Sequence, residues 1–108
     1  MPKFMVKARY NAEGLKGLKK DKASGREKAV AAACAKIGGK LDALYYALGE
    51  EDAYVILDLP SHVAAAQIAI AVGGSGMFSS VTTVPLLTIA EADEALGADH
   101  SAYRPPGH

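Results

Sequence analysis

The side chains with the most evident chemistry fall on one predicted sheet face. In residues 3–10, one set of alternate positions is apolar and the other is Lys3, Met5, Lys7 and Arg9, which predicts a strand with Lys7 and Arg9 on the side away from the core. The same alternation in residues 53–59 places Tyr54 and Asp58 on that second face if the intervening positions are core. The predicted ligand-binding set on this face is therefore Lys7, Arg9, Tyr45, Tyr54 and Asp58.

Such a set suits an anionic aromatic or carboxylate ligand held in a cavity between two subunits. An arginine offers a two-pronged donor for carboxylates, and exclusion of water strengthens each charged contact. The alternative is that Lys7, Arg9 and Asp58 form ordinary ion pairs at a subunit interface. The residue pattern leaves both alternatives open.

His62 stands at the start of a predicted helix, directly after Pro60 and the N-cap candidate Ser61. The positive end of a helix dipole lowers the pKa of a histidine, which suits a general acid or base. No second catalytic group is set by spacing, so an exposed first-turn histidine is the simpler interpretation. His62 joins the candidate ligand-binding residues on this basis.

An acidic turn, Glu50, Glu51 and Asp52, separates two strand-like segments. Three successive carboxylates can bind a hard cation, but on a tight turn they are typical of a solvated tip. Asp52 is also placed to accept from nearby backbone N–H groups, as turn aspartates do. His100 and His108 lie in the tail without the spacing of metal ligands, so neither a metal nor a cofactor is predicted.

The elements before the acidic turn follow from periodicity and glycine positions. Residues 11–25 contain three glycines and several lysines, which predicts a mobile connection with at most one helical turn. A helical pattern begins at Ser24 and stops at Gly38-Gly39. Its apolar stripe, with an i, i+3, i+4, i+7 spacing, comprises Val30, Ala33, Cys34 and Ile37.

The remaining elements alternate strand and helix. Residues 40–48 and 53–59 predict a hairpin. Residues 62–72 are almost wholly Ala, Ile and Val and predict a helix buried on most sides. A last strand over 78–89 contains a proline, which indicates an edge position or a bulge, and an acidic helical turn over 90–96 follows.

The order strand, helix, strand, strand, helix, strand predicts an α+β fold, a ferredoxin-like βαββαβ sandwich with two helices on one sheet face. The two hairpin strands are apolar at both alternating sets of positions, which is more than a solvated face tolerates. We therefore expect the open face to pair with a second subunit. The predicted partner is the protein itself, as a homodimer or a larger homo-oligomer.

Length, charge and cysteine content limit the alternatives. A chain of 108 residues suits one domain, and a single cysteine suits a reducing compartment. Residues 1–40 carry a net charge of about +8 and residues 41–108 about −8, and a compact fold allows these charges to pair, so no nucleic-acid partner is expected. No apolar run approaches the roughly 20 residues of a membrane span, so we expect a cytoplasmic protein without a membrane partner.

The chain resembles the GYD domain family of small bacterial and archaeal proteins. The family is named after a Gly-x-Tyr-Asp element, of which Gly49 and Asp52 match, while Glu51 stands in place of the usual Tyr. The likeness covers residues 1–96 and leaves 97–108 as a flexible tail. The other matching segments are Gly38-Gly39-Lys40, Tyr45, Asp58 to Pro60, Leu86-Leu87-Thr88, Tyr10 to Lys20 and Leu59 to Val72.

This resemblance implies a ferredoxin-like, dimeric α/β-barrel-type fold and supplies architecture rather than chemistry. Three functions remain open. The first is a ligand-binding oligomer with an inter-subunit pocket. The second is a cofactor-free oxygenase or isomerase, in which His62 or Asp58 is the base and Arg9 holds an oxyanion in the same cavity. The third is a structural interaction protein without a pocket.

Overall fold

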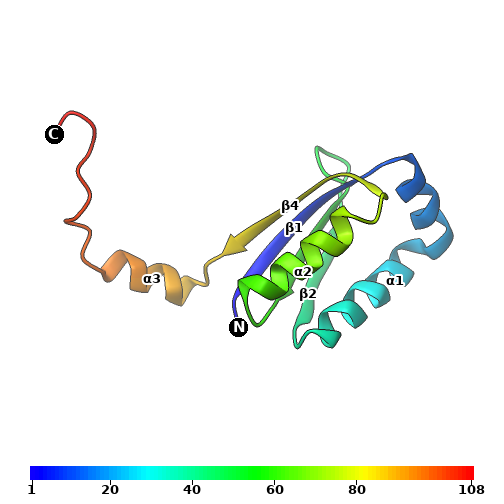
Figure 1. The fold of residues 1–108 in the computed structure, drawn as a ribbon, viewed down its shortest axis with the longest axis horizontal. Coiled ribbons are helices and arrows are strands. Elements are labelled where there is room, and N and C mark those ends of the chain that lie inside the picture. Colours follow the sequence, from blue (N-terminus) through cyan, green and yellow to red (C-terminus); the bar gives the residue numbers. More distant parts are fainter.

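The computed structural model describes all residues from Met1 to His108. One antiparallel sheet has the strand order β2-β3-β1-β4, and α1 and α2 lie on one of its faces (Figure 1). This α+β arrangement confirms the ferredoxin-like fold. Along the chain the elements are β1 (Lys3–Tyr10), α1 (Ala12–Lys36), β2 (Lys40–Tyr46), β3 (Ala53–Asp58), α2 (His62–Gly73), β4 (Phe78–Leu86) and α3 (Ile89–Gly97).

The core lies between the sheet and the helices. Phe4 and Val6 of β1 are buried there, as predicted, together with Cys34 of α1 and Ala64 of α2. Burial raises the pKa of the Cys34 thiol, which keeps it protonated and suits an apolar packing role. The apolar side of β1 therefore faces the helices, as the alternation predicted.

The segment predicted as a mobile connection is helical, so the prediction for residues 11–25 is wrong. Asn11 caps α1 by accepting a 2.8 Å hydrogen bond from the N–H of Gly14. Gly14 is buried, and an added Cβ would lie 1.9 Å from the carbonyl oxygen of Met77. The glycine thus permits close packing of the helix instead of breaking it. Lys22, with φ of 65°, places a kink between the two parts of α1.

The predicted stop of this helix is confirmed. Gly38 has φ of 80°, the left-handed conformation that glycine adopts without steric cost. Its N–H donates to the carbonyl of Ala35 at 3.2 Å, and the N–H of Gly39 donates to the carbonyl of Cys34 at 2.9 Å. These two bonds form a Schellman motif and satisfy the last carbonyl groups of α1.

The second helix begins at the predicted cap but is not buried on most sides. Ser61 accepts a 3.1 Å hydrogen bond from the N–H of Ala64. Val63 and Ile70, however, are 72% and 74% exposed, because only one side of α2 packs on the four-stranded sheet. The prediction of an enclosed helix is therefore wrong for the single chain. The proline of β4, Pro85, lies on an edge strand, as predicted.

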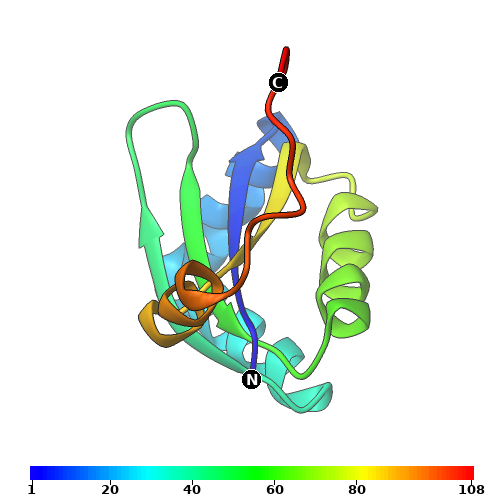
Figure 2. The same cartoon turned by 90° about the vertical axis from the view of Figure 1, so that its left-hand side faces the viewer.

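The chain end projects from the sheet. β4 ends at Leu86, earlier than predicted, and α3 follows with a capping box between Thr88 and Glu91. In Figure 1 and in the turned view of Figure 2, α3 and the tail lie on the side of the sheet opposite α1. No helix of the structure has the length and apolar character needed to cross a bilayer.

Candidate functional site

The predicted site residues are divided between several places. Lys7 is the register partner of Tyr54, and Tyr54 is the register partner of Tyr45. These three side chains therefore form one row across β1, β3 and β2 on the open face, as the alternation predicted. Tyr45 is 71% exposed. Arg9 follows in the next row on that face, where its guanidinium donates to the backbone carbonyl of Glu50.

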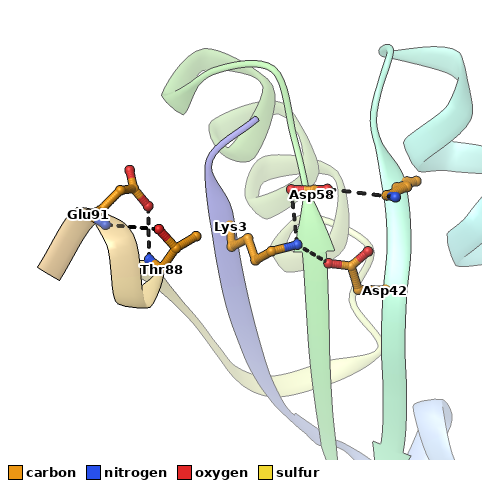
Figure 3. Close-up of polar contacts among 6 residues, drawn as sticks. Lys3, Asp42, Asp58, Thr88 and Glu91 are labelled. Atoms are coloured by element: carbon orange, nitrogen blue, oxygen red, sulfur yellow. Dashed lines mark hydrogen bonds and ion pairs between the residues drawn. The ribbon is translucent and has the colours of Figure 1, made fainter. Parts of the chain in front are cut away.

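Asp58 lies at the other end of the same face. Its register partner on β1 is Lys3, and Lys7 lies four positions further along this strand, or roughly 13 Å away. The Lys3 ammonium lies 3.4 Å from the Asp58 carboxylate and 2.5 Å from Asp42 (Figure 3). Lys40 approaches Asp58 at 4.0 Å. Asp58 thus belongs to a cluster of alternating charges rather than to a site with Lys7 and Arg9.

This charge cluster joins the two oppositely charged parts of the sequence. The hydrogen bond to Asp42 and the contact with Asp58 raise the pKa of Lys3, so the ammonium form is favoured. The ion pairs connect cations before residue 41 with acids after it. In the folded chain, some of the basic residues of the first part therefore pair with acidic residues of the second part, as predicted.

The acidic turn holds the end of β1 in place. The backbone N–H of Tyr10 donates to the Asp52 carboxylate at 2.9 Å, and the N–H of Asp52 donates to the carbonyl of Ala8 at 2.9 Å. The β1–β4 register shifts between Arg9 and Tyr10, so the Asp52 carboxylate satisfies a backbone donor at an irregularity. The Asp of the motif therefore bonds the backbone of β1 in this chain. Gly49 has open space around its Cα, with no atom within 4 Å of an added Cβ.

His62 lies on the helix side of the sheet. Its ring is nearly perpendicular to the ring of Phe4 at a centroid distance of 5.3 Å, and Phe4 is one of the core residues that face the helices. Arg9 has the opposite orientation on β1. His62, Asp58 and Arg9 are therefore three separate groups within one subunit, and the base and cation of the predicted enzyme do not meet in a single-chain cavity.

A cleft on the helix side is the feature that the sequence analysis missed. An apolar cavity of about 60 Å³ lies over β1 and β3 and between α1 and α2. Thirteen residues line it, and Arg26 is the one that is not hydrophobic. The lining comprises Val6, Ala8, Tyr10, Arg26, Val30, Leu44, Tyr46, Ala53, Val55, Leu57, Ile68, Val72 and Phe78.

The cavity adjoins a wider hollow beside the first part of α1. This hollow has a volume of about 300 Å³ and shares Tyr10, Arg26 and Phe78 with the apolar cavity. Its other lining residues are Gly14, Gly17, Leu18, Asp21, Ser75 and Met77. Ligand pockets in proteins typically have volumes of about 300–1,000 Å³ with a few polar groups among apolar ones. The two spaces together have that size and composition, and we refer to them as the helix-side cleft.

Two tyrosines bring hydroxyl groups to the apolar cavity of the helix-side cleft. The hydroxyl groups of Tyr10 and Tyr46 lie 3.2 Å apart, and their rings stack at a centroid distance of 6.4 Å. Burial, followed by the hydrogen bond with Tyr10, raises the pKa of Tyr46 well above the usual value for tyrosine. Tyr46 therefore remains a neutral phenol at physiological pH, able to donate or accept a hydrogen bond but unsuited to act as a base.

Arg26 brings a positive charge to the mouth of the cleft. Its guanidinium lies 3.8 Å from the Asp21 carboxylate, and its side chain is 33% exposed. Tyr10 and Tyr46 occupy the helix-facing positions of β1 and β2, where a tyrosine hydroxyl needs a buried partner. From the sequence, this need for a hydrogen-bond partner was the one indication that the two tyrosines could belong to a site. Their meeting, however, depends on strand register and on the path of α1.

The fold and the cleft define a class of protein, a ferredoxin-like α+β domain with a pocket under its two helices. A family model described as GYD domain matches residues 4–96. The chain belongs to the GYD domain family, as the motifs indicated. No curated protein and no solved structure matches the chain at a significant level.

Proposed function

We propose that this domain binds a small aromatic or largely apolar molecule that carries one anionic or hydroxyl group, and that the helix-side cleft is the binding site. The observation that carries the proposal is the joined pair of spaces, an apolar cavity of about 60 Å³ and a hollow of about 300 Å³, with Tyr10 and Arg26 shared between them. Apolar walls favour burial of a ring, and a few polar groups orient it.

Each polar group has a distinct role in this proposal. The Tyr10 and Tyr46 hydroxyl groups, 3.2 Å apart, form a pair that hydrogen-bonds a ligand hydroxyl or carboxylate oxygen. Arg26 faces the wider hollow, where its guanidinium can exchange the 3.8 Å contact with Asp21 for a bidentate contact with an anion. A neutral ligand would lose that contribution, so carboxylates and phenolates are the favoured classes.

The inter-subunit pocket predicted from the sequence stays a prediction. Its row of Tyr45, Tyr54 and Lys7 lies on the open face, and a second subunit is needed to enclose it. The helix-side cleft, in contrast, is complete within one chain. This difference makes the cleft the better-supported site for the same ligand class.

The test is thermal-shift titration of the full chain with a panel of substituted benzoates, phenols and their neutral amides. Ligands that bind only the folded state raise the melting temperature with concentration. We expect some aromatic acids to bind, with affinity reduced about tenfold by Arg26→Gln, because one charge-assisted contact contributes on the order of 1.5 kcal/mol. Tyr46→Phe should weaken binding as well.

Two controls keep the result specific. Tyr45→Phe removes an exposed hydroxyl from the open face, and Arg104→Gln removes a cation from the tail, so neither should change binding. Binding that is insensitive to Arg26→Gln and Tyr46→Phe but is lost with Tyr45→Phe would place the ligand on the open face instead. Native mass spectrometry of freshly purified protein adds an independent readout, since a retained small molecule appears as extra mass.

A further inference from the structure

A third space adjoins the apolar cavity but not the wider hollow. It has a volume of about 140 Å³ and is lined by Ala23, Ser24, Glu27, Leu44 and Tyr46. Leu44 and Tyr46 line the apolar cavity as well, so the two spaces meet at these side chains. None of the five residues lines the wider hollow. The apolar cavity therefore connects two separate spaces.

These two outer spaces lie on different sides of α1. Arg26 lines the wider hollow, and the next residue, Glu27, lines the third space. Successive residues of an α-helix point about 100° apart, so the two side chains leave α1 in different directions. The wider hollow includes Phe78 of β4, whereas the third space includes Leu44 and Tyr46 of β2, and these strands form opposite edges of the sheet.

The arrangement of the helices agrees with this separation. α1 packs nearest to β2, and α2 packs nearest to β4 (Figures 1 and 2). The three spaces thus form one passage beneath α1. We call the wider hollow the Arg26 end of the passage and the third space the Glu27 end.

The two ends of the passage carry opposite charges. At the Arg26 end, the guanidinium lies 3.8 Å from the Asp21 carboxylate. At the other end, Glu27 makes no ion pair within the chain. Ser24 adds a hydroxyl oxygen that can accept a hydrogen bond, and Tyr46 adds an aromatic ring. A carboxylate, a hydroxyl and an aromatic ring around one space are groups that bind an ammonium ion.

The apolar cavity between the ends has the size of one ring. A water-sized group takes roughly 10–15 Å³ of cavity volume, so about 60 Å³ holds about four to six non-hydrogen atoms. Twelve of the thirteen lining residues are hydrophobic, which favours a ring over a charged group at this place. A molecule that fills the whole passage therefore carries its two polar groups on opposite sides of its ring.

We propose that the Glu27 end is a subsite for a primary ammonium group, and that the ligand is an aromatic acid with this ammonium on the far side of its ring. The proposal rests on the proposed function, which places the carboxylate at Arg26. The ammonium lies between the Glu27 carboxylate and the Tyr46 ring, with the Ser24 hydroxyl as a further acceptor. An α-amino acid is disfavoured, because its two charges lie at one end and cannot reach both ends of the passage.

Calorimetric titration of the full chain with matched benzoates tests the subsite. The ammonium probes are 4-(aminomethyl)benzoate and 4-(2-aminoethyl)benzoate, and their uncharged counterparts of equal length are 4-ethylbenzoate and 4-propylbenzoate. At least one ammonium probe should bind about fivefold more tightly than its counterpart, which is the upper end of what an exposed ion pair contributes. Phenylalanine should bind no more tightly than 3-phenylpropionate, which lacks only the ammonium.

Three variants connect this gain to particular side chains. Glu27→Gln should weaken binding of the ammonium probe about fivefold and leave its counterpart unchanged, since only the ammonium pairs with Glu27. Arg26→Gln should weaken binding of both, because both carry the carboxylate. The control Glu13→Gln removes the same charge from α1 at a side chain that is 66% exposed and lines none of the three spaces, so it should change neither. Circular dichroism of each unliganded variant checks that the fold is retained.

The outcomes separate this proposal from the proposed function. If the benzoates depend on Arg26 but the ammonium probes bind wild type and Glu27→Gln equally, the ammonium subsite is overturned and the proposed function stands. If Glu27→Gln weakens only the ammonium probes and Arg26→Gln weakens none, the subsite is supported and the carboxylate does not bind at Arg26. Absence of binding for every probe overturns both.

Discussion

The Asp52 carboxylate accepts a 2.9 Å hydrogen bond from the backbone N–H of Tyr10, although the two residues lie on different segments of the chain. This bond connects the family motif with the helix-side cleft. Tyr10 lines both parts of the cleft and contacts the Tyr46 hydroxyl at 3.2 Å. The turn therefore positions a cleft residue without taking part in the cleft itself.

Asp52→Ala should destabilise the domain by about 1–2 kcal/mol, since the half-buried N–H of Tyr10 loses its acceptor. Asp52→Asn retains an acceptor oxygen and should cost less. Urea denaturation followed by circular dichroism measures both. The matched control is Glu50→Ala, which removes an exposed side chain from the same turn and should leave the free energy of unfolding within about 0.5 kcal/mol of the wild type. Equal losses at the two positions would contradict the role assigned to Asp52.

Two glycines of α1 should respond to alanine in opposite directions. At Gly14 an added Cβ would lie 1.9 Å from the Met77 carbonyl oxygen, so Gly14→Ala should destabilise by about 1–3 kcal/mol. At Gly17 an added Cβ meets nothing within 4 Å, so Gly17→Ala should stabilise by about 0.5–1 kcal/mol through helix propensity. Thermal and urea unfolding measure both. If Gly17→Ala brought no gain, the first part of α1 would not be a stable helix.

One of the five tyrosines should titrate later than tyrosine usually does, because burial and Tyr10 raise the pKa of Tyr46. The folded state holds this proton more tightly than the unfolded state. The resulting stability is therefore fully present below pH 10 and declines as the pH rises further. Absorbance titration of the phenolate shows the late step directly. Tyr46→Phe should abolish it, and Tyr45→Phe should retain it.

The Lys3 charge cluster should make a pH-dependent contribution to stability. The pKa of Lys3 is raised above its ordinary 10.5, so its contribution is present below that pH and is lost as the pH rises through the folded-state value. Lys3→Met should therefore lower the melting temperature at pH 7 and have a smaller effect as the pH rises above 10.5. Lys28→Met, at an exposed position without an ion pair, should not change the melting temperature at either pH.

The sequence was sufficient for topology because the signals for topology are local. Alternation in β1 identified the core side of the sheet, and Gly38 and Ser61 marked where one helix ends and the next begins. Pro85 indicated an edge strand because a proline cannot donate to a neighbouring strand. Each of these inferences uses only residues that are adjacent in the chain.

The candidate site could be predicted only in part. Alternation placed Lys7, Tyr54 and Asp58 on one face, but it does not indicate how far apart these residues lie along that face. The strand register gives this separation, because it pairs Lys7 with Tyr54 and Asp58 with Lys3 at the other end of β1. His62 was assigned to the same site from its residue type and its place in the first turn of a helix, and it lies on the other side of the sheet against Phe4. Residue type and face are thus local properties, whereas convergence on a site is not.

What the sequence determined by itself is the order of the helices and strands, the face of the sheet that is buried against the helices, and the membership of the GYD domain family. Only the tertiary structure decided that residues 12–21 are helical, since the close packing of Gly14 on Met77 offsets the helix-breaking tendency of glycine. It also decided that Tyr10, Tyr46 and Arg26 share a cleft. These contacts join residues from three separate elements, and no periodicity within any one of them encodes where the others lie.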